Sequence, residues 1–231
     1  MKPISRLALL LAPLVLVACK KNTPADVAPA VLVAVPAPAA APAPIAAPAA
    51  PAAVDPEKMT DEQKDTARRQ EKLDFGTMED KYINDPLAQW ATGASASSSY
   101  SDPEPSKYYL PTKLIGATDG EHWQNKSDDI GFEWVQVDYA KPVFATEVRL
   151  VLPSGDGVEA LNKVELQDTE GKWHTIWSGL SEVKPDSRGP RTWFVRTFPK
   201  TSYKVKAVKY TEANNLQSGS KKFDAAQLVG E

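Results

Sequence analysis

The sequence predicts an all-β fold, an antiparallel β-sandwich over residues 86–231. Short runs rich in Val, Thr, Tyr and Trp alternate in polarity from Trp90 onward, as strands with one buried face do. Turn-forming residues interrupt these runs roughly every 8 to 15 residues. No segment after Phe75 has the 3.6-residue apolar stripe of a helix, so we expect antiparallel strands without crossover helices.

The expected strands follow from this alternation. In the first clear run, Val135, Val137 and Tyr139 fall on one face, and Pro142 is expected to close the run. The most convincing hairpin joins 163–167 to 173–177 through the turn at 168–171, which carries Asp and Gly. The remaining expected strands are 146–152, with Val148, Leu150 and Leu152 inward, followed by 191–198, 203–210 and 223–229.

The first 18 residues predict a signal peptide. Lys2 and Arg6 precede an apolar run, residues 7–17, which is too short to cross a bilayer core of about 30 Å. The run ends in Leu-Val-Ala-Cys, which resembles the bacterial lipobox and implies cleavage before Cys19 and acylation at that residue, with palmitate among the acyl chains. Such acyl chains would anchor the protein in the lipid bilayer. The alternative is an ordinary secretory signal with a chance cysteine.

Two further segments separate this anchor from the sandwich. Residues 19–55 are mostly Ala, Pro and Val, and the prolines prevent helix and sheet, so a disordered or polyproline linker is expected. Residues 56–80 are charged and contain a capping box, Thr60 with Gln63, which predicts a short and mostly solvated helix that docks one end on the domain. The alternative is a helix that binds a partner. Because Lys20 rather than Asp follows Cys19, the enteric sorting habit implies the outer membrane of the cell envelope.

Composition excludes several classes of function. The chain has one Cys and two His, so it holds no intramolecular disulfide and no Cys/His zinc cluster. No nucleophile elbow or metal-ligand spacing occurs, which argues against an enzyme. An acidic chain with net charge −3 and an export signal is a poor candidate for binding nucleic acid.

Five motifs in register resemble the discoidin (coagulation-factor C-type) domain of the galactose-binding-like superfamily. They are ASASSSY at 94–100, ATDG at 117–120 followed by Trp123, EWVQVDY at 133–139, VELQDTEGKW at 164–173 and FDAAQLVG at 223–230. The resemblance implies a jelly roll whose loops at one end bind glycans, lipid headgroups or proteins. The sequence departs from the family at Ala140 and Lys222, and it lacks the disulfide of the animal members.

Candidate ligand contacts lie in two loops that meet at one end of the domain in this family. The first offers His122, Trp123 and Asn125, and the second offers Arg188 and Arg191. A sugar site needs an aromatic face and a few fixed polar groups, which these residue types supply. The alternatives are that Trp123 belongs to the core and that His122 is an ordinary solvated histidine.

The resemblance also implies a structural calcium ion beside the Asp-Gly loop. Asp119 matches the loop aspartate, and Asp224 or Glu231 would add another hard oxygen ligand. Lys222 weakens this expectation. The alternative is that Asp119 caps its own turn.

A basic segment runs from Lys184 to Lys222, with ten bases against Asp186 and Glu212. It would attract anionic polysaccharide or phospholipid headgroups. The alternative is a solvated face whose bases pair with acids elsewhere. The leading hypothesis is a membrane-anchored lipoprotein that displays a non-catalytic, carbohydrate-binding module. The second hypothesis is a structural or assembly lipoprotein that contacts envelope proteins or anionic headgroups through its basic strands.

Overall fold

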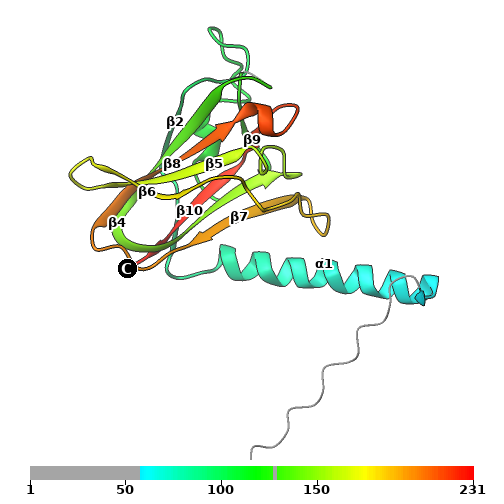
Figure 1. Cartoon of the computed structure of the whole chain (residues 1–231). Coiled ribbons are helices and arrows are strands. Elements are labelled where there is room, and N and C mark those ends of the chain that lie inside the picture. The colour runs from blue at the N-terminus through cyan, green and yellow to red at the C-terminus, as the bar shows by residue number, and fades with distance from the viewer. Residues whose placement is uncertain (1–57, 127–128) are drawn as a thin grey trace, which may run out of the picture. The chain divides into compact units, whose positions relative to one another are not determined.

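One long strand, β4 (Phe132–Pro153), runs through both layers of the sandwich in the computed structural model, which describes residues 58–126 and 129–231. The first half of β4 pairs with β2 (Gly93–Ala96) and β8 (Lys204–Ala213). The second half pairs with β7 (Arg191–Thr197) and β10 (Ala225–Gly230). All of these pairings are antiparallel. Because its two halves pair within different layers, β4 joins the two layers (Figure 1).

The bend in β4 corrects the expectation that Pro142 closes a strand. The ladder between β4 and β8 shifts register between Asp138 and Val143, and the residues between these two have no partner in β8. Proline has no amide hydrogen to donate, and such an irregularity tolerates it. Pro142 therefore lies at the bend between the layers and does not end the strand. Ala140, where the sequence departs from the discoidin pattern, lies in the same bend.

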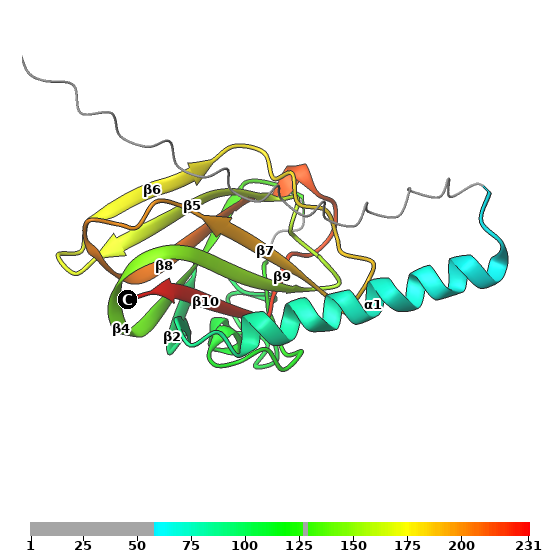
Figure 2. The same cartoon turned by 90° about the horizontal axis from the view of Figure 1, so that it is seen from below.

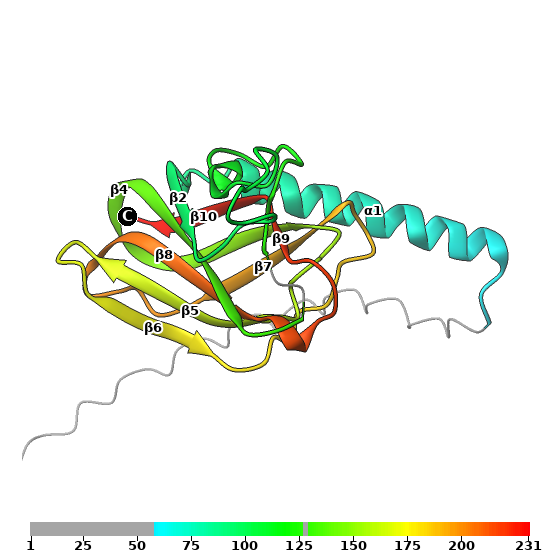
Figure 3. The ribbon, with the colours of Figure 1, turned by 90° about the horizontal axis from the view of Figure 1, so that it is seen from above.

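The two layers differ in their number of strands. The first has the order β1-β10-β4-β7, and the second has the order β2-β4-β8-β5-β6. A separate two-stranded ladder joins β3 to β9. The remaining bounds are β1 (Ala88–Trp90), β3 (Trp123–Gln124), β5 (Leu161–Asp168), β6 (Trp173–Ser178) and β9 (Lys222–Phe223), with short 3₁₀ turns η2 (Pro111–Leu114) and η3 (Asn214–Leu216). The layers are visible from above in Figure 3.

The core between the layers is mostly aliphatic. Val135 and Val137 are fully buried, as the alternation predicts, and Val148, Leu150 and Leu152 are fully buried in the second half of β4. Trp123 is the one tryptophan among the buried members of this cluster. The antiparallel sandwich predicted from the sequence is therefore the fold observed.

Helix α1 (Asp61–Ile83) covers part of the outer face of the first layer, as seen from below in Figure 2. Met78 and Tyr82 pack on Val151 and Trp193, so residues on both faces of β4 are buried there. Phe75 is 3% exposed and packs over Gly189, where a Cβ atom would lie 2.1 Å from the Phe75 ring. The absence of a side chain at position 189 thus makes room for the helix.

The capping box predicted for the helix is present. The Thr60 hydroxyl accepts from the Gln63 amide, and the Gln63 side chain accepts from the Thr60 amide. The helix begins and ends a few residues later than expected. Its half up to Asp74 is exposed apart from Ala67, so only the second half contacts the sandwich.

Arg149 fixes the end of α1 to the first layer. Its guanidinium pairs with Asp85 at 2.7 Å and donates to the Tyr82 carbonyl at 3.3 Å and to the Gln227 side chain at 3.0 Å. The helix is therefore an integral part of the described structure.

The predicted signal peptide, Cys19 and the linker up to residue 55 lie outside the described residues. Within the residues that are described, no helix combines the length and the apolar character that spanning a membrane requires. The lipid anchor stays a prediction.

Candidate functional site

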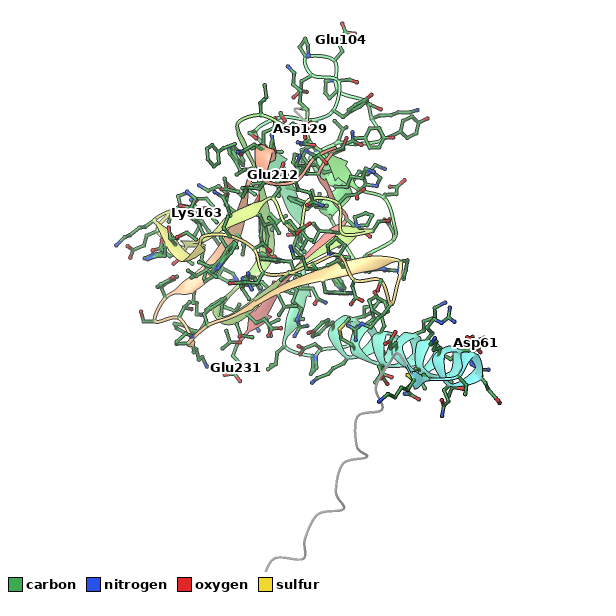
Figure 4. The ribbon with its side chains drawn as sticks, turned by 45° about the vertical axis from the view of Figure 1, so that its right-hand side comes forward. Asp61, Glu104, Asp129, Lys163, Glu212 and Glu231 are labelled. Carbon is green, nitrogen blue, oxygen red and sulfur yellow. The ribbon has the colours of Figure 1, made fainter. Side chains whose placement is uncertain are left out.

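Several connections gather at one end of the sandwich, which we call the loop end. They are the long loop between β2 and β3, the loop between β3 and β4, and the segment from η3 to β9; Figure 4 marks this end with Glu104 and Asp129. Backbone hydrogen bonds tie the long loop to β3, because Tyr100 donates to the Gln124 carbonyl at 2.9 Å and Gln124 donates to the Tyr109 carbonyl at 3.4 Å. The loop is thus held in place by β3.

Trp123 lies in the core beneath this end. Its side chain is fully buried, its ring packs against Phe223 at 5.3 Å, and its indole Nε1 donates to the Ser98 carbonyl at 2.9 Å. The ring therefore offers no exposed face for stacking on a sugar. This placement agrees with the core alternative considered for Trp123.

Asn125 joins two segments of the loop end. It is fully buried; its side-chain oxygen accepts from the Lys221 amide at 2.9 Å, and its backbone amide donates to the Lys221 carbonyl at 3.2 Å. Its Nδ2 also donates to the Asn214 side chain at 3.4 Å. These bonds give Asn125 a structural role, and a ligand does not reach it in this arrangement.

His122 packs against Tyr109 with ring centroids 5.4 Å apart. Both ring nitrogens are buried. Burial lowers the pKa of His122, so the ring is neutral at neutral pH. In this arrangement the His122 ring supports Tyr109 by packing against it.

The residues that sequence reasoning missed are the tyrosines next to His122. Tyr109 meets Tyr100 edge to face at 5.4 Å, and Tyr100 is 43% exposed. Tyr108 is 63% exposed, with the Lys107 ammonium 5.2 Å from its ring centre. We call Tyr100, Tyr109 and His122 the aromatic cluster. A signal was available, because three tyrosines fall within ten residues of a proline-rich loop.

The two aspartates proposed as calcium ligands do meet, but their arrangement does not suit a cation. Asp224 is 2% exposed and accepts from the Thr118 hydroxyl at 2.6 Å and from the amides of Asp119 and Gly120 at 3.3 and 3.1 Å. Hydrogen-bond donors therefore surround its carboxylate. Burial raises the pKa of Asp224.

Asp119 itself closes its own turn, since its carboxylate accepts from the Glu121 amide at 2.8 Å. In residues 58–126 and 129–231 no group of three or more His, Cys, Asp or Glu side chains is arranged to hold a metal ion. Lys222 pairs with Asp156 at 2.9 Å. The residues present at this loop thus do not fit the calcium ion that the resemblance implies.

Arg188 and Arg191 lie beside helix α1. Arg191 pairs with Glu79 of the helix at 3.2 Å and donates to the Thr118 hydroxyl at 2.8 Å. Arg188 donates to both carboxylate oxygens of Asp186, and this contact lowers the pKa of Asp186. Of the two arginines, only Arg191 reaches the loop that precedes His122, and it does so through Thr118.

Most of the basic segment forms ion pairs. Eight of its ten bases have an acidic partner within 4.0 Å, and Lys209 with Glu165 at 3.0 Å is one example. Lys204 and Lys206 have none within the described residues. The segment therefore carries much less free positive charge than its composition indicates, as the ion-pairing alternative expects.

No protein-family model matches the sequence, and no curated protein matches it. Several solved structures are similar. The family 32 CBM from C. perfringens NanJ, in complex with galactose, is 14% identical, covers 62% of this chain and 98% of its own, and has a TM-score of 0.46. CpGH89CBM32-5 from Clostridium perfringens, in complex with GalNAc-beta-1,3-galactose, is 13% identical, covers 62% and 100%, and has a TM-score of 0.47.

A chitosan-binding module from a chitosanase/glucanase of Paenibacillus sp. IK-5 is 12% identical, covers 61% of this chain and 96% of its own, and has a TM-score of 0.45. These carbohydrate-binding modules are what the chain is similar to in fold.

Proposed function

We propose that this chain is a lipid-anchored protein of the bacterial cell envelope whose sandwich is a non-catalytic module for binding saccharides. The observation that carries the proposal is the aromatic cluster at the loop end. Two tyrosine rings meet edge to face there on a loop that is already fixed to β3. Aromatic rings held in place favour binding because little entropy is lost when a ligand packs on them.

The surroundings of the cluster suit an uncharged ligand. Glu121 forms an ion pair with Lys113, so neither charge is free. The pKa of His122 is lowered by burial, so its ring adds no charge. The C–H face of a sugar would stack on Tyr100 or Tyr109, and the tyrosine hydroxyls would bond to sugar hydroxyls.

The test uses a glycan array probed with the mature, lipidated chain in detergent. Tyr109→Ala is expected to weaken binding to the recognised glycan at least tenfold, which is about 1.4 kcal/mol. Phe132→Ala is the matched control, because Phe132 is 70% exposed at the same end but lies outside the cluster. Unchanged affinity in Tyr109→Ala, or an equal loss in Phe132→Ala, would contradict the assigned site.

The anchor is tested separately. Cys19→Ser is expected to release the chain from the membrane fraction or to leave it unprocessed, because Cys19 is the only cysteine of the chain and the lipobox cleavage precedes it. Processed Cys19→Ser protein that still sediments with membranes would contradict lipid anchoring.

A second candidate function, contact with an envelope protein, is favoured by other exposed side chains at the loop end. Ile130 is 75% exposed, Phe132 is 70% exposed and Leu216 is 40% exposed. Exposed apolar side chains are a feature of protein-binding surfaces. A pull-down from the cell envelope whose partner is lost in Phe132→Ala and kept in Tyr109→Ala would favour this second function.

A further inference from the structure

A hollow of about 360 Å³ lies at the end of the sandwich opposite the loop end. It forms where the β5–β6 turn, the bend of β4 and the start of β8 meet. Figure 4 marks this end with Glu231, whose carbonyl accepts from the Phe144 amide at 2.7 Å. The lining residues are Phe144, Asp168, Thr169, Glu170, Ser202, Tyr203 and Lys204.

Asp168 gives the hairpin side of the hollow its shape. One carboxylate oxygen accepts from the amides of Glu170 and Lys172 at 3.0 and 2.9 Å, which fixes the turn. The other lies 2.7 Å from Nε2 of His174. The contact with His174 and the two amide bonds lower the pKa of Asp168, so its carboxyl group is ionised at neutral pH. The hydrogen-bond partners of this carboxylate all belong to the hairpin itself.

His174 in turn fixes Tyr203. The two rings stack with centroids 3.9 Å apart and planes inclined by 16°. The Thr201 hydroxyl donates to the Tyr203 carbonyl at 2.7 Å and accepts from the Ala145 amide at 2.9 Å, which joins Tyr203 to the segment that carries Phe144. Tyr203 is thus a fixed aromatic side chain in the wall of the hollow, because His174 and Thr201 hold it in place without a ligand.

Phe144 supplies the second aromatic side chain, and the rim is polar. The Lys204 ammonium lies 5.7 Å from the centre of the Phe144 ring. Thr169, Glu170 and Ser202 are exposed at the rim. Glu170 and Lys204 carry opposite charges, and Asp168 is occupied by its own hairpin, so the rim favours neither anions nor cations.

We propose that this hollow is a second saccharide-binding site that takes a neutral sugar of one or two rings. Its volume falls within the range of about 300 to 1,000 Å³ typical of small-molecule sites. Fixed aromatic walls and exposed hydroxyl and charged groups match the apolar face and the hydroxyls of a sugar. The inference takes the ligand class from the proposed function but not its site, so the domain would hold one saccharide at each end.

The experiment follows amide NMR signals of the mature, lipidated chain in detergent while lactose and, separately, N,N′-diacetylchitobiose are added. We expect two groups of shifted signals with separate titration curves, one at 100–123 and one at 168–174 and 202–204. Tyr203→Ala and Phe144→Ala are each expected to weaken the second titration at least tenfold and to leave the first unchanged. Tyr203→Phe keeps the stack on His174 and is the control for folding.

The outcomes separate this inference from the proposed function. Shifts confined to 100–123 would overturn the second site and leave the loop-end site standing. Shifts confined to the hollow would refute the loop-end site and keep the inference. If neither sugar shifts signals in either region, both proposals fail.

Discussion

Glu212 is expected to make the protein less stable as the pH rises. Its side chain is fully buried on β8, opposite Glu133 of β4, and both of its carboxyl oxygens lack a hydrogen-bond partner within the described residues. Burial raises the pKa of Glu212 well above the ordinary value of 4.5, and repulsion from Glu133 adds to this, while Lys221 opposes it. The folded protein therefore keeps a proton on Glu212 that the unfolded chain releases.

The sign and the size of the effect follow from this difference. A carboxyl group whose pKa is raised by folding stabilises the protein fully below the unfolded-state pKa. The stabilisation is lost as the pH rises toward the folded-state pKa. Between these two values the free energy of unfolding falls by about 1.4 kcal/mol per pH unit for a single group. Glu212→Gln removes the titrating proton and with it this slope.

The assay is urea unfolding of the wild type and of Glu212→Gln between about pH 4.5 and pH 8. Glu133, Lys221 and Asp129 also lie near this position, and because they are the same in both proteins their contributions cancel to first order in the difference. Glu104→Gln, at an exposed position, is the control. A difference between wild type and Glu212→Gln that stays constant with pH would refute the reasoning.

Three further predictions concern the docking of helix α1, the effect of calcium on stability and the salt dependence of saccharide binding. Phe75→Ala should lower the free energy of unfolding by about 3 kcal/mol and remove the hydrogen-exchange protection of α1, and unchanged protection would contradict the docking described for the helix. The melting temperature should be the same in calcium and in chelator, and a lower value in chelator would reveal a metal site that the residues around Asp119 and Asp224 do not suggest. Saccharide affinity should change less than twofold between 50 and 500 mM salt, whereas a steep fall would reveal free charges at the site.

The layers of the sandwich were predictable because alternation is a local signal. Val135 and Val137 are buried as expected, since side chains along a strand point to opposite faces in turn. The path of β4 through Pro142 was not predictable, because the register shift that tolerates a proline there depends on the partner strand. The expected strand 223–229 divides at Asp224 for a similar reason, because the Asp224 carboxylate bonds to a loop more than a hundred residues earlier in the chain.

The candidate site was less predictable, because a tryptophan in a loop and one in a core look the same in a sequence. Trp123 is buried by Phe223, a contact between segments far apart in the chain. The aromatic cluster likewise depends on how the long loop returns to β3. The sequence does show that aromatic residues are present at the loop end, but it does not tell which of them are exposed.

Helix α1 restricts where this domain can bind a ligand. The sequence predicts a mostly solvated helix with one end docked on the domain, and its second half does cover the outer face of the first layer, where Glu79 pairs with Arg191. Arg191 is therefore not a free cation, and most other bases of the basic segment also form ion pairs. Since charge on that segment is largely compensated and α1 covers one face, the fixed aromatic side chains at the two ends of the sandwich are the places where we propose that a ligand binds. A ligand with an apolar face and no net charge suits them better than an anionic polymer.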